Sequence, residues 1–241
     1  MTGLRVAVIG AAGYVGAALV DALGKHTRWD VVPVVRTEYH RHRAAGRYDV
    51  VINAACPSKR FWAERNPDAD HEESVGATLR LREQWHWGRF VQISSISART
   101  QLDTVYGRHR RDAERLCSGS DTFIVRLGPM YGGDYRKGVL ADMAADRPVF
   151  ASGSSRQSFA PVRWCADWIV EHLGDTGLRE VGARTTVTLA EVRDAVGSHS
   201  DFAKDYVDDQ FPVTATGTDW PEAAAVIDWL AGQRVSGAWT N

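Results

Sequence analysis

Three side chains near the middle of the sequence are of types that could do acid–base chemistry together: Ser95, Tyr106 and Arg110. Tyr106 and Arg110 are four residues apart in a basic stretch, 103–117, whose pattern predicts a helix, so both lie on one face of it. A phenol titrates at about 10, and a cation beside it favours the ionised form by about 1.4 kcal/mol for each pKa unit. By type alone, Tyr106 also suits a helix surface, and Ser95 also suits a strand-end hydroxyl that bonds to the backbone.

The element that must hold a cofactor against these groups is predicted at the start of the chain. An apolar strand over residues 4–9 runs into glycines spaced as G-x-x-G-x-x-G, and a helical pattern follows. Such a turn brings backbone N–H groups and a helix N-terminus to an anion, which predicts the binding of a dinucleotide pyrophosphate. An ordinary strand-to-helix turn is the alternative. The residues of this turn expected to contact the cofactor are Gly10, Gly13, Tyr14, Val15 and Gly16.

A cluster of arginines and histidines follows the second predicted strand, residues 31–35. It could be a solvated loop or a short polar helix. In dinucleotide-binding folds, however, the end of this strand reaches the adenosine ribose, where an acidic residue repels a 2′-phosphate and an arginine attracts it. Arg36 occupies that position, and the first acidic residue after it is Glu38. We therefore expect NADP(H) to be favoured over NAD(H).

Two further predicted strands end in residues suited to ligand contact. Residues 48–55 end in small side chains, which let a cofactor lie against the backbone, and residues 122–127 lead into a loop rich in glycine. Ligands in parallel sheets bind at this carboxyl edge. Only about a dozen residues separate Arg36 from the first of these strands, so one helix-and-strand unit of the sheet is missing. The cofactor contacts predicted here are Asn53, Ala54, Ala55, Leu127, Gly128 and Met130.

The remaining chain predicts alternating helices and strands. Residues 56–65 read as loop, and Asn66 and Pro67 are placed to begin a helix that continues to about Trp85. Thr188 and Glu191 have the spacing of a capping box. Further elements are predicted as a strand at 90–93, helices at 137–146 and 164–173, a short strand near Val149, a strand at 185–189, and a final helix from Pro221 to Gly232.

Composition restricts the class of partner. The formal net charge is −1, so no overall field favours nucleic acid or an anionic membrane, and a small-molecule substrate is expected. No apolar run approaches the roughly 20 residues that cross a bilayer, and the first strand leaves no room for a signal peptide, which predicts the cytoplasm. The three cysteines lack the spacing of a disulfide framework or a zinc site, and we expect no metal.

In their order along the chain, these motifs resemble the extended short-chain dehydrogenase/reductase family, whose members include epimerases, dehydratases and ketoreductases. The resemblance rests on the glycine turn, on 49–55, on the segment ending at Ser95, on Tyr106 with Arg110, and on 126–132. It covers most of residues 4–173 and indicates a shortened member. The fold it implies is α/β, a Rossmann-like doubly wound parallel sheet (1–173) with a small C-terminal lobe (174–241) that completes the substrate site, although the segments could interleave.

The resemblance also implies the chemistry. Tyr106 matches the family's proton donor or acceptor, Ser95 matches the residue that holds the substrate oxygen, with Ser97 a less favoured alternative, and Arg110 stands where the family has lysine. Ser74 stands where many relatives carry asparagine. An NAD(P)(H)-dependent ketoreductase or epimerase acting on a sugar-like or natural-product ketone or alcohol is expected. The alternative is an inactive NAD(P)-binding sensor or scaffold. A homodimer through residues 72–85 and 103–117 is also implied.

Overall fold

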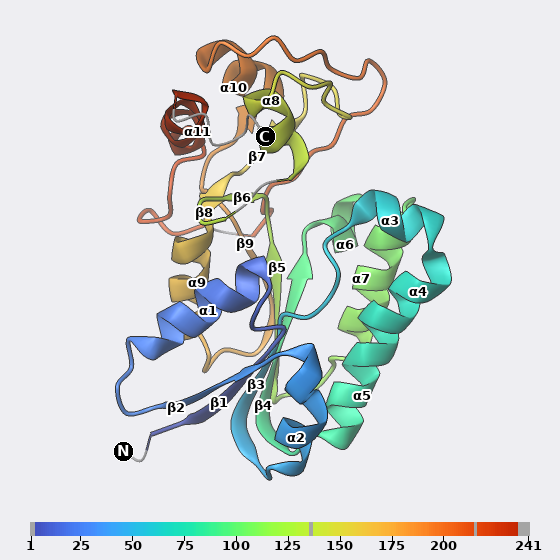
Figure 1. Cartoon of the computed structure of the whole chain (residues 1–241), viewed down its shortest axis with the longest axis vertical. Helices are drawn as coiled ribbons and strands as arrows, with labels where there is room; N and C mark the ends of the chain where they lie inside the picture. The colour runs from blue at the N-terminus through green and yellow to red at the C-terminus, as the bar shows by residue number, and fades with distance from the viewer. Residues whose placement is uncertain (1–2, 135–136, 215, 236–241) are drawn as a thin grey trace. The chain divides into compact units, whose positions relative to one another are not determined.

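A computed structural model describes residues 3–134, 137–214 and 216–235 (Figure 1). Its strands are β1 (Arg5–Ile9), β2 (Asp30–Val34), β3 (Tyr48–Asn53), β4 (Trp87–Ser95), β5 (Thr122–Leu127), β6 (Met130–Tyr131), β7 (Arg156–Gln157), β8 (Ala160–Pro161), β9 (Gly177–Val181) and β10 (Val187–Thr188). Its helices are α1 (Tyr14–Gly24), η1 (Arg36–Glu38), α2 (Tyr39–Ala44), α3 (Arg60–Arg65), α4 (Pro67–His71), η2 (Glu72–Gly76), α5 (Ala77–Gln84), α6 (Ser97–Thr100), α7 (Val105–Arg115), α8 (Gly138–Ala144), α9 (Val162–Glu171), α10 (Leu189–Ala195) and α11 (Ala225–Val235).

The main sheet of the described residues has six strands in the order β2-β1-β3-β4-β5-β9. The four pairings from β2 to β5 are parallel. Figure 1 shows α1 and α9 on one side of this sheet and α3 to α7 on the other. The predicted Rossmann-like, doubly wound α/β fold is confirmed. Because β2 and β3 lie on opposite sides of β1, the strand order reverses there, and the crevice at that point is where such folds bind ligands.

The sequence forms this sheet because its strands are apolar on both faces. Residues 6–9 of β1 are almost fully buried, and two of them, Ala7 and Ile9, pack with side chains of β3, α5 and β4 in one core. Between β2 and β3 the described chain forms only η1 and α2, which together have nine residues, and no strand. One helix-and-strand unit is therefore missing here, as the short spacing predicted. This short link places β3 beside β1, where its end meets the glycine turn.

The chain divides into two compact units whose segments interleave. The first consists of residues 1–127 and 163–180, and the second of residues 128–162 and 181–241. This division differs from the expected boundary after residue 173. The reason is that α9 covers the sheet, where Trp168 packs on Phe123, and β9 extends the sheet beside β5, while 128–162 contributes to the other core.

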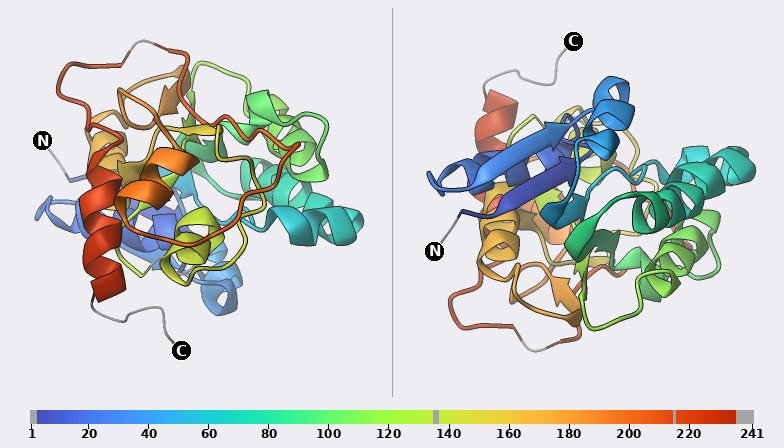
Figure 2. Two further views of the ribbon diagram at one scale, coloured as in Figure 1. Left: turned by 90° about the horizontal axis from the view of Figure 1, so that it is seen from above. Right: turned by 90° about the horizontal axis from the view of Figure 1, so that it is seen from below.

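The second unit is built around its own apolar core, which α8, α10 and α11 supply together with the chain near Phe159 and Ala183. Figure 2 shows these three helices grouped, in yellow-green, orange and red. Two small sheets, β6 with β8 and β7 with β10, complete the unit. The predicted capping box is confirmed, since the Thr188 hydroxyl accepts from the Glu191 N–H and the Glu191 carboxylate accepts from the Thr188 N–H.

The helix predicted from Pro67 to about Trp85 is confirmed as the continuous helical run of α4, η2 and α5, in which η2 is a π-helical turn. Two other expectations about elements were wrong. The stretch 56–65, predicted as loop, contains α3, which packs against α7, a tertiary contact with no local signal. The last helix begins at Ala225, later than the proline at 221, and it continues through Gly232 to Val235.

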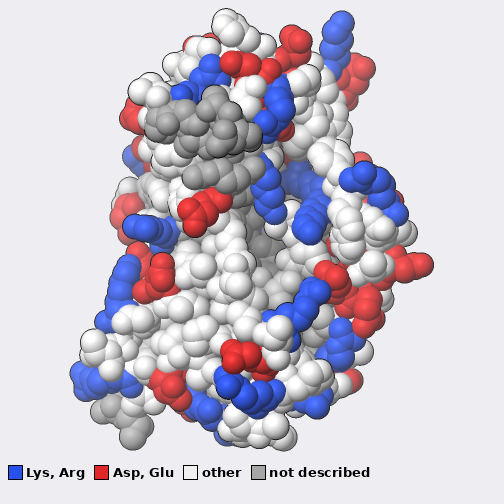
Figure 3. Space-filling view, in the orientation of Figure 1, with Lys and Arg blue, Asp and Glu red and all other residues white. Residues whose placement is uncertain are grey.

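The face of the molecule in Figure 3 carries acidic and basic side chains interspersed, as the near-zero net charge requires. Among the described residues, no helix combines the length and apolar character needed to cross a bilayer.

Candidate active site

The glycine turn after β1 is packed so closely that larger residues do not fit. Gly10 has a φ of +82°, and a Cβ atom there would lie 2.7 Å from the Cα of Ala55. A Cβ on Gly16 would overlap the carbonyl oxygen of Gly10. The backbone at the end of β3 thus touches the turn, and this contact requires glycine at position 10.

The N-terminus of α1 follows this turn and is open to an anion. Its N-cap is Gly13, and among the described residues no side chain caps it and no acidic residue lies in its first turn. Tyr14 and Val15 are its first two residues, at the end where backbone N–H groups point out of the helix. The macrodipole adds a partial positive charge at this end. The turn and helix thus fit the pyrophosphate of a dinucleotide. The glycines at 10 and 16 support this fit, because a side chain at either position would clash with the backbone of the turn or of the end of β3.

Arg36 begins η1, directly beyond the carboxyl end of β2. Its side chain is 89% exposed, and its Nη2 atom lies 3.8 Å from Oε1 of Glu73 in η2. An exposed pair at this distance is weak. The guanidinium is therefore able to turn toward a phosphate group with little loss.

Asn53 contributes to the site through the shape of the strand end. Its side chain is buried, and its Nδ2 atom donates to Oγ1 of Thr78 at 3.1 Å and to Oε1 of Gln92 at 3.0 Å. Its Oδ1 atom accepts from the N–H of Ala55 at 3.2 Å. The side chain that sequence reasoning assigned to a ligand therefore ties β3 to β4 and to α5 and fixes the backbone at Ala55.

The predicted contacts after β5 fall in two places. Leu127 is buried and pairs with Ser95 across β4 and β5. Gly128 and Met130 belong to the second unit, in which the Gly128 N–H donates to the carbonyl of Val181 and Met130 pairs with Ala160.

Ser95 lies at the carboxyl end of β4, and its Oγ accepts from the N–H of Ser97 at 3.2 Å. The Ser97 hydroxyl accepts from Nη2 of Arg60 at 3.3 Å and is thus oriented by α3. A Cβ on Gly107 would lie 2.8 Å from the carbonyl oxygen of Ser97, so α7 approaches this segment closely just after Tyr106. Consecutive backbone contacts thus connect the segments that carry the serine and the tyrosine.

Tyr106 and Arg110 form the predicted pair on the buried face of α7. The Cζ atom of Arg110 lies 4.9 Å from the centroid of the Tyr106 ring, and the guanidinium donates to the carbonyl of Pro57. Both side chains are buried. Burial lowers the pKa of Arg110, but the electron-rich groups of Tyr106, Cys56 and Asp70 outweigh it and raise the pKa above its ordinary value. The guanidinium therefore stays charged beside the Tyr106 ring.

Ser74, which the resemblance predicts to stand where many relatives carry asparagine, is buried in the π-helical turn η2, where its carbonyl accepts from Oγ1 of Thr78 at 2.7 Å. Such turns often occur at functional sites. The first turn of α7 is fixed by two groups that sequence reasoning missed. The Thr104 hydroxyl accepts from the Gly107 N–H at 3.0 Å, and the Glu64 carboxylate accepts from the Val105 N–H at 2.7 Å. The spacing of Thr104 before the helix was a capping signal, whereas Glu64 is distant in sequence.

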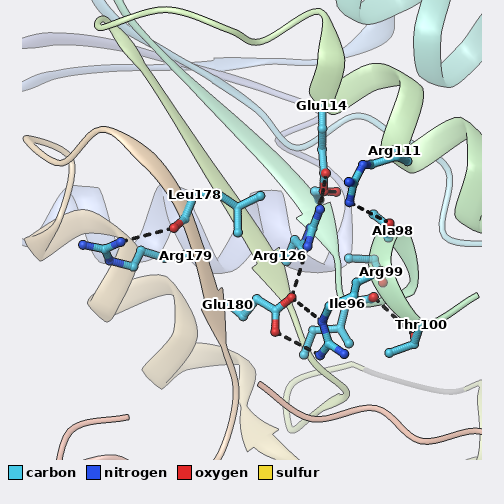
Figure 4. Close-up of polar contacts among 12 residues, drawn as sticks. Ile96, Ala98, Arg99, Thr100, Arg111, Glu114, Arg126, Leu178, Arg179 and Glu180 are labelled. Carbon is cyan, nitrogen blue, oxygen red and sulfur yellow. Dashed lines mark hydrogen bonds and ion pairs between the residues drawn. The ribbon is translucent and has the colours of Figure 1, made fainter. Parts of the chain in front are cut away.

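A buried ionic network ties α7 to the sheet (Figure 4). Glu114, two turns after Tyr106, accepts from Nε of Arg126 at 2.8 Å and from its Nη2 at 2.6 Å. Arg126 also donates to Glu180 at 3.2 Å, and Glu180 accepts two hydrogen bonds from Arg99. The Ser94 hydroxyl donates to Glu114 at 2.6 Å. Two carboxylates and two guanidinium groups thus balance in charge and join α7, β5, β9 and α6.

Comparison with known proteins agrees with this geometry. The model of the NAD dependent epimerase/dehydratase family matches residues 6–132. Solved structures similar to this chain include UDP-glucose 4-epimerase of Thermotoga maritima with UDP-glucose (15% identity, 98% of this chain and 99% of that chain covered, TM-score 0.76). A second is UDP-glucuronic acid 4-epimerase of Bacillus cereus with UDP-glucuronic acid and NAD (15% identity, 96% of this chain and 97% of that chain covered, TM-score 0.68). A third is RMD of Pseudomonas aeruginosa with NADPH (19% identity, 97% of this chain and 99% of that chain covered, TM-score 0.74).

The comparison with curated proteins finds no significant match. Since the family model covers more than half of the chain, the protein belongs to the NAD dependent epimerase/dehydratase family. The resemblance to extended short-chain dehydrogenases/reductases is confirmed.

Proposed function

We propose that this protein is an NADP(H)-dependent oxidoreductase that acts as a ketoreductase or epimerase on a sugar-like or natural-product ketone or alcohol. The observation that carries the proposal is the buried pair of Tyr106 and Arg110, in which the guanidinium Cζ lies 4.9 Å from the centroid of the tyrosine ring. The helix that holds this pair packs against the segment after Ser95, and the same unit has a glycine turn that fits a pyrophosphate. Family membership supports it, as do similar structures that contain NAD or NADPH. Two of the similar structures contain UDP-sugars and the third contains NADPH, and the substrate class proposed for this chain rests on its family.

The proposed roles follow from the positions of the side chains. When bound, the reduced nicotinamide supplies a hydride to the carbonyl carbon of the substrate. The Ser95 hydroxyl donates a hydrogen bond to the carbonyl oxygen, and Tyr106 transfers its phenolic proton to that oxygen as negative charge develops there. Arg110 stabilises the phenolate that remains, because its cation lies over the ring. The alcohol forms as the C–H and O–H bonds are made, and the tyrosine then regains a proton from solvent.

The test of the activity is consumption of NADPH against a panel of ketones and nucleotide-linked keto sugars, with chromatography for epimerised products. Tyr106→Phe is expected to lower kcat by about 10²–10⁴-fold, because general acid catalysis contributes this much. Tyr39→Phe removes a phenol from α2, which lies in another part of the unit, and serves as the control. Equal rates for the wild type and Tyr106→Phe would refute the role of Tyr106.

The preference for NADP(H) is proposed from Arg36, the exposed cation at the end of β2. Fluorescence titration of NADPH and NADH measures it. Arg36→Ala is expected to weaken NADPH by about tenfold and to leave NADH unchanged, because only NADPH carries the 2′-phosphate. Arg41→Ala, also exposed and paired with Glu38, is a matched control in the neighbouring helix. Equal affinities of the wild type for the two cofactors would contradict the preference.

A second candidate is a protein that binds the dinucleotide without turnover. It is favoured by one observation, that the position expected to hold lysine has an arginine whose guanidinium donates to the Pro57 carbonyl. Arginine and lysine place charge and donors differently. A sensor would bind NADPH with no turnover across the panel, and Arg110→Lys would change nothing measurable. Turnover that responds to Arg110→Lys in either direction would exclude this candidate.

A further inference from the structure

Helix α4 buries a carboxylate that the proposed chemistry does not use. The residue is Asp70, which is fully buried. Its Oδ2 atom lies 2.8 Å from Nδ1 of His109 on α7, and its Oδ1 atom has no hydrogen-bond partner within the described part of the chain. A buried carboxylate with an unused oxygen costs free energy, and such a group is retained where it has a charge to balance.

A second buried ionisable group follows His109 directly along α7, the guanidinium of Arg110. Arg110 is also buried, and its Nε atom has no hydrogen-bond partner among the residues that the structure describes. The negative charge of Asp70 helps to keep this guanidinium protonated. A buried carboxylate oxygen on α4 and a buried guanidinium N–H on α7 thus both lack a partner among the described residues, and these two helices pack together.

Other ionisable groups surround this cluster. His71 follows Asp70 at the end of α4, and its ring packs edge-on to that of His109 with centroids 5.2 Å apart. The elements packed against α7 are α3, α4, η2, α6 and β4. Their charged or titratable residues near this end, with Cys56 from the loop after β3, are Arg60, Glu64, Asp68, Asp70, His71, Glu72, Glu73 and Arg99. Among these acidic residues of the described structure, only Asp70 is buried, and the other carboxylates reach solvent.

We propose that Asp70, held in place by His109, is the buried counter-ion of Arg110 and thereby limits how strongly Arg110 favours the phenolate of Tyr106. The inference rests on the proposed function for its catalytic meaning. Asp70 is a positioning residue that acts through Arg110. An arginine that stands where relatives have lysine keeps its charge at every working pH, and a carboxylate behind it moderates the field at the tyrosine so that the phenol retains the proton it must deliver.

The first experiment measures the titration of Tyr106 without cofactor or substrate. The phenolate absorbance of the wild type minus that of Tyr106→Phe isolates this residue. Asp70→Asn is expected to lower the midpoint by about one pH unit, because a neighbouring negative charge has been removed. Asp68→Asn makes the same charge change at an exposed position of the same helix and is expected to leave the midpoint unchanged. An unchanged or raised midpoint in Asp70→Asn would overturn the proposal.

The second experiment measures the coupling between the two charges by thermal unfolding. Arg110→Met leaves Asp70 without its counter-ion, whereas the double variant Asp70→Asn/Arg110→Met removes both charges. The double variant is therefore expected to melt at a higher temperature than Arg110→Met alone, even if Asp70→Asn by itself does not fold. Losses that simply add would overturn the proposal. Neither experiment depends on turnover. If Tyr106→Phe and the wild type turn over at equal rates, the proposed function is refuted, but the titration and the unfolding measurements still test the role of Asp70.

Discussion

Replacing Arg126 by methionine would break the network that fixes α7 to the sheet. In the native protein its guanidinium, only 7% exposed, makes two hydrogen bonds to Glu114 and one to Glu180. Burial lowers the pKa of Arg126, but the two carboxylates outweigh this effect and raise it, so the group is charged. Methionine fills part of the same volume and supplies no donor.

The magnitude follows from what each carboxylate keeps. Glu180 retains Arg99, which donates to its two oxygens at 2.8 and 3.0 Å. Glu114 retains only the Ser94 hydroxyl among the partners described above. One buried negative charge is thus left without a cation, and the expected loss is about 3–5 kcal/mol of unfolding free energy. That is a large part of the roughly 5–15 kcal/mol available to a domain.

Urea denaturation followed by circular dichroism measures the loss, with equal m values required for the comparison. Arg115→Met is the control, because Arg115 is 71% exposed and its pair with Asp112 contributes less than about 1 kcal/mol. A loss below about 1 kcal/mol in Arg126→Met would refute the reasoning.

Three further predictions concern other parts of the chain. Gly16→Ala places a methyl group on a backbone carbonyl, so NADPH affinity measured by fluorescence is expected to fall at least about tenfold, whereas Gly24→Ala, with open space around it, is expected to change little. Thr188→Ala removes the α10 cap, and chemical denaturation should show a loss of about 1 kcal/mol. The pKa of Asp146 is lowered to about 2 by hydrogen bonds, first from Arg234. Asp146→Asn should therefore melt below the wild type at neutral pH and converge with it as the pH falls from about 4 to 2, with an effect kept small by solvent.

The sequence predicted those features that depend on neighbours along the chain. The glycine turn, the apolar strands, the capping box at Thr188 and the shared face of Tyr106 and Arg110 all follow from local spacing, because a helix or strand repeats at a fixed period. The family resemblance added the Rossmann-like fold, which the structure confirms, and the expected roles of Ser95, Tyr106 and Arg110, which stay predictions.

Features that depend on residues far apart were not predictable in this way. The interleaving of 128–162 with 181–241 follows from which core each segment enters, and α3 forms where the sequence indicates a loop because it packs on α7. The Asn53 side chain donates to Thr78 and Gln92, two partners that its position at the strand end did not indicate. In each case a partner dozens of residues away decides the outcome.

The sequence by itself thus determined that the chain carries a dinucleotide turn and places a phenol beside a guanidinium, since both are patterns of a few residues. Only the tertiary structure decided what surrounds that pair. Asp70 reaches the α7 cluster through α4, and Glu114 meets Arg126 and Glu180 through the sheet. The physical reason is that charges interact more strongly when they are buried away from water, and which charges are buried together depends on how the whole chain packs.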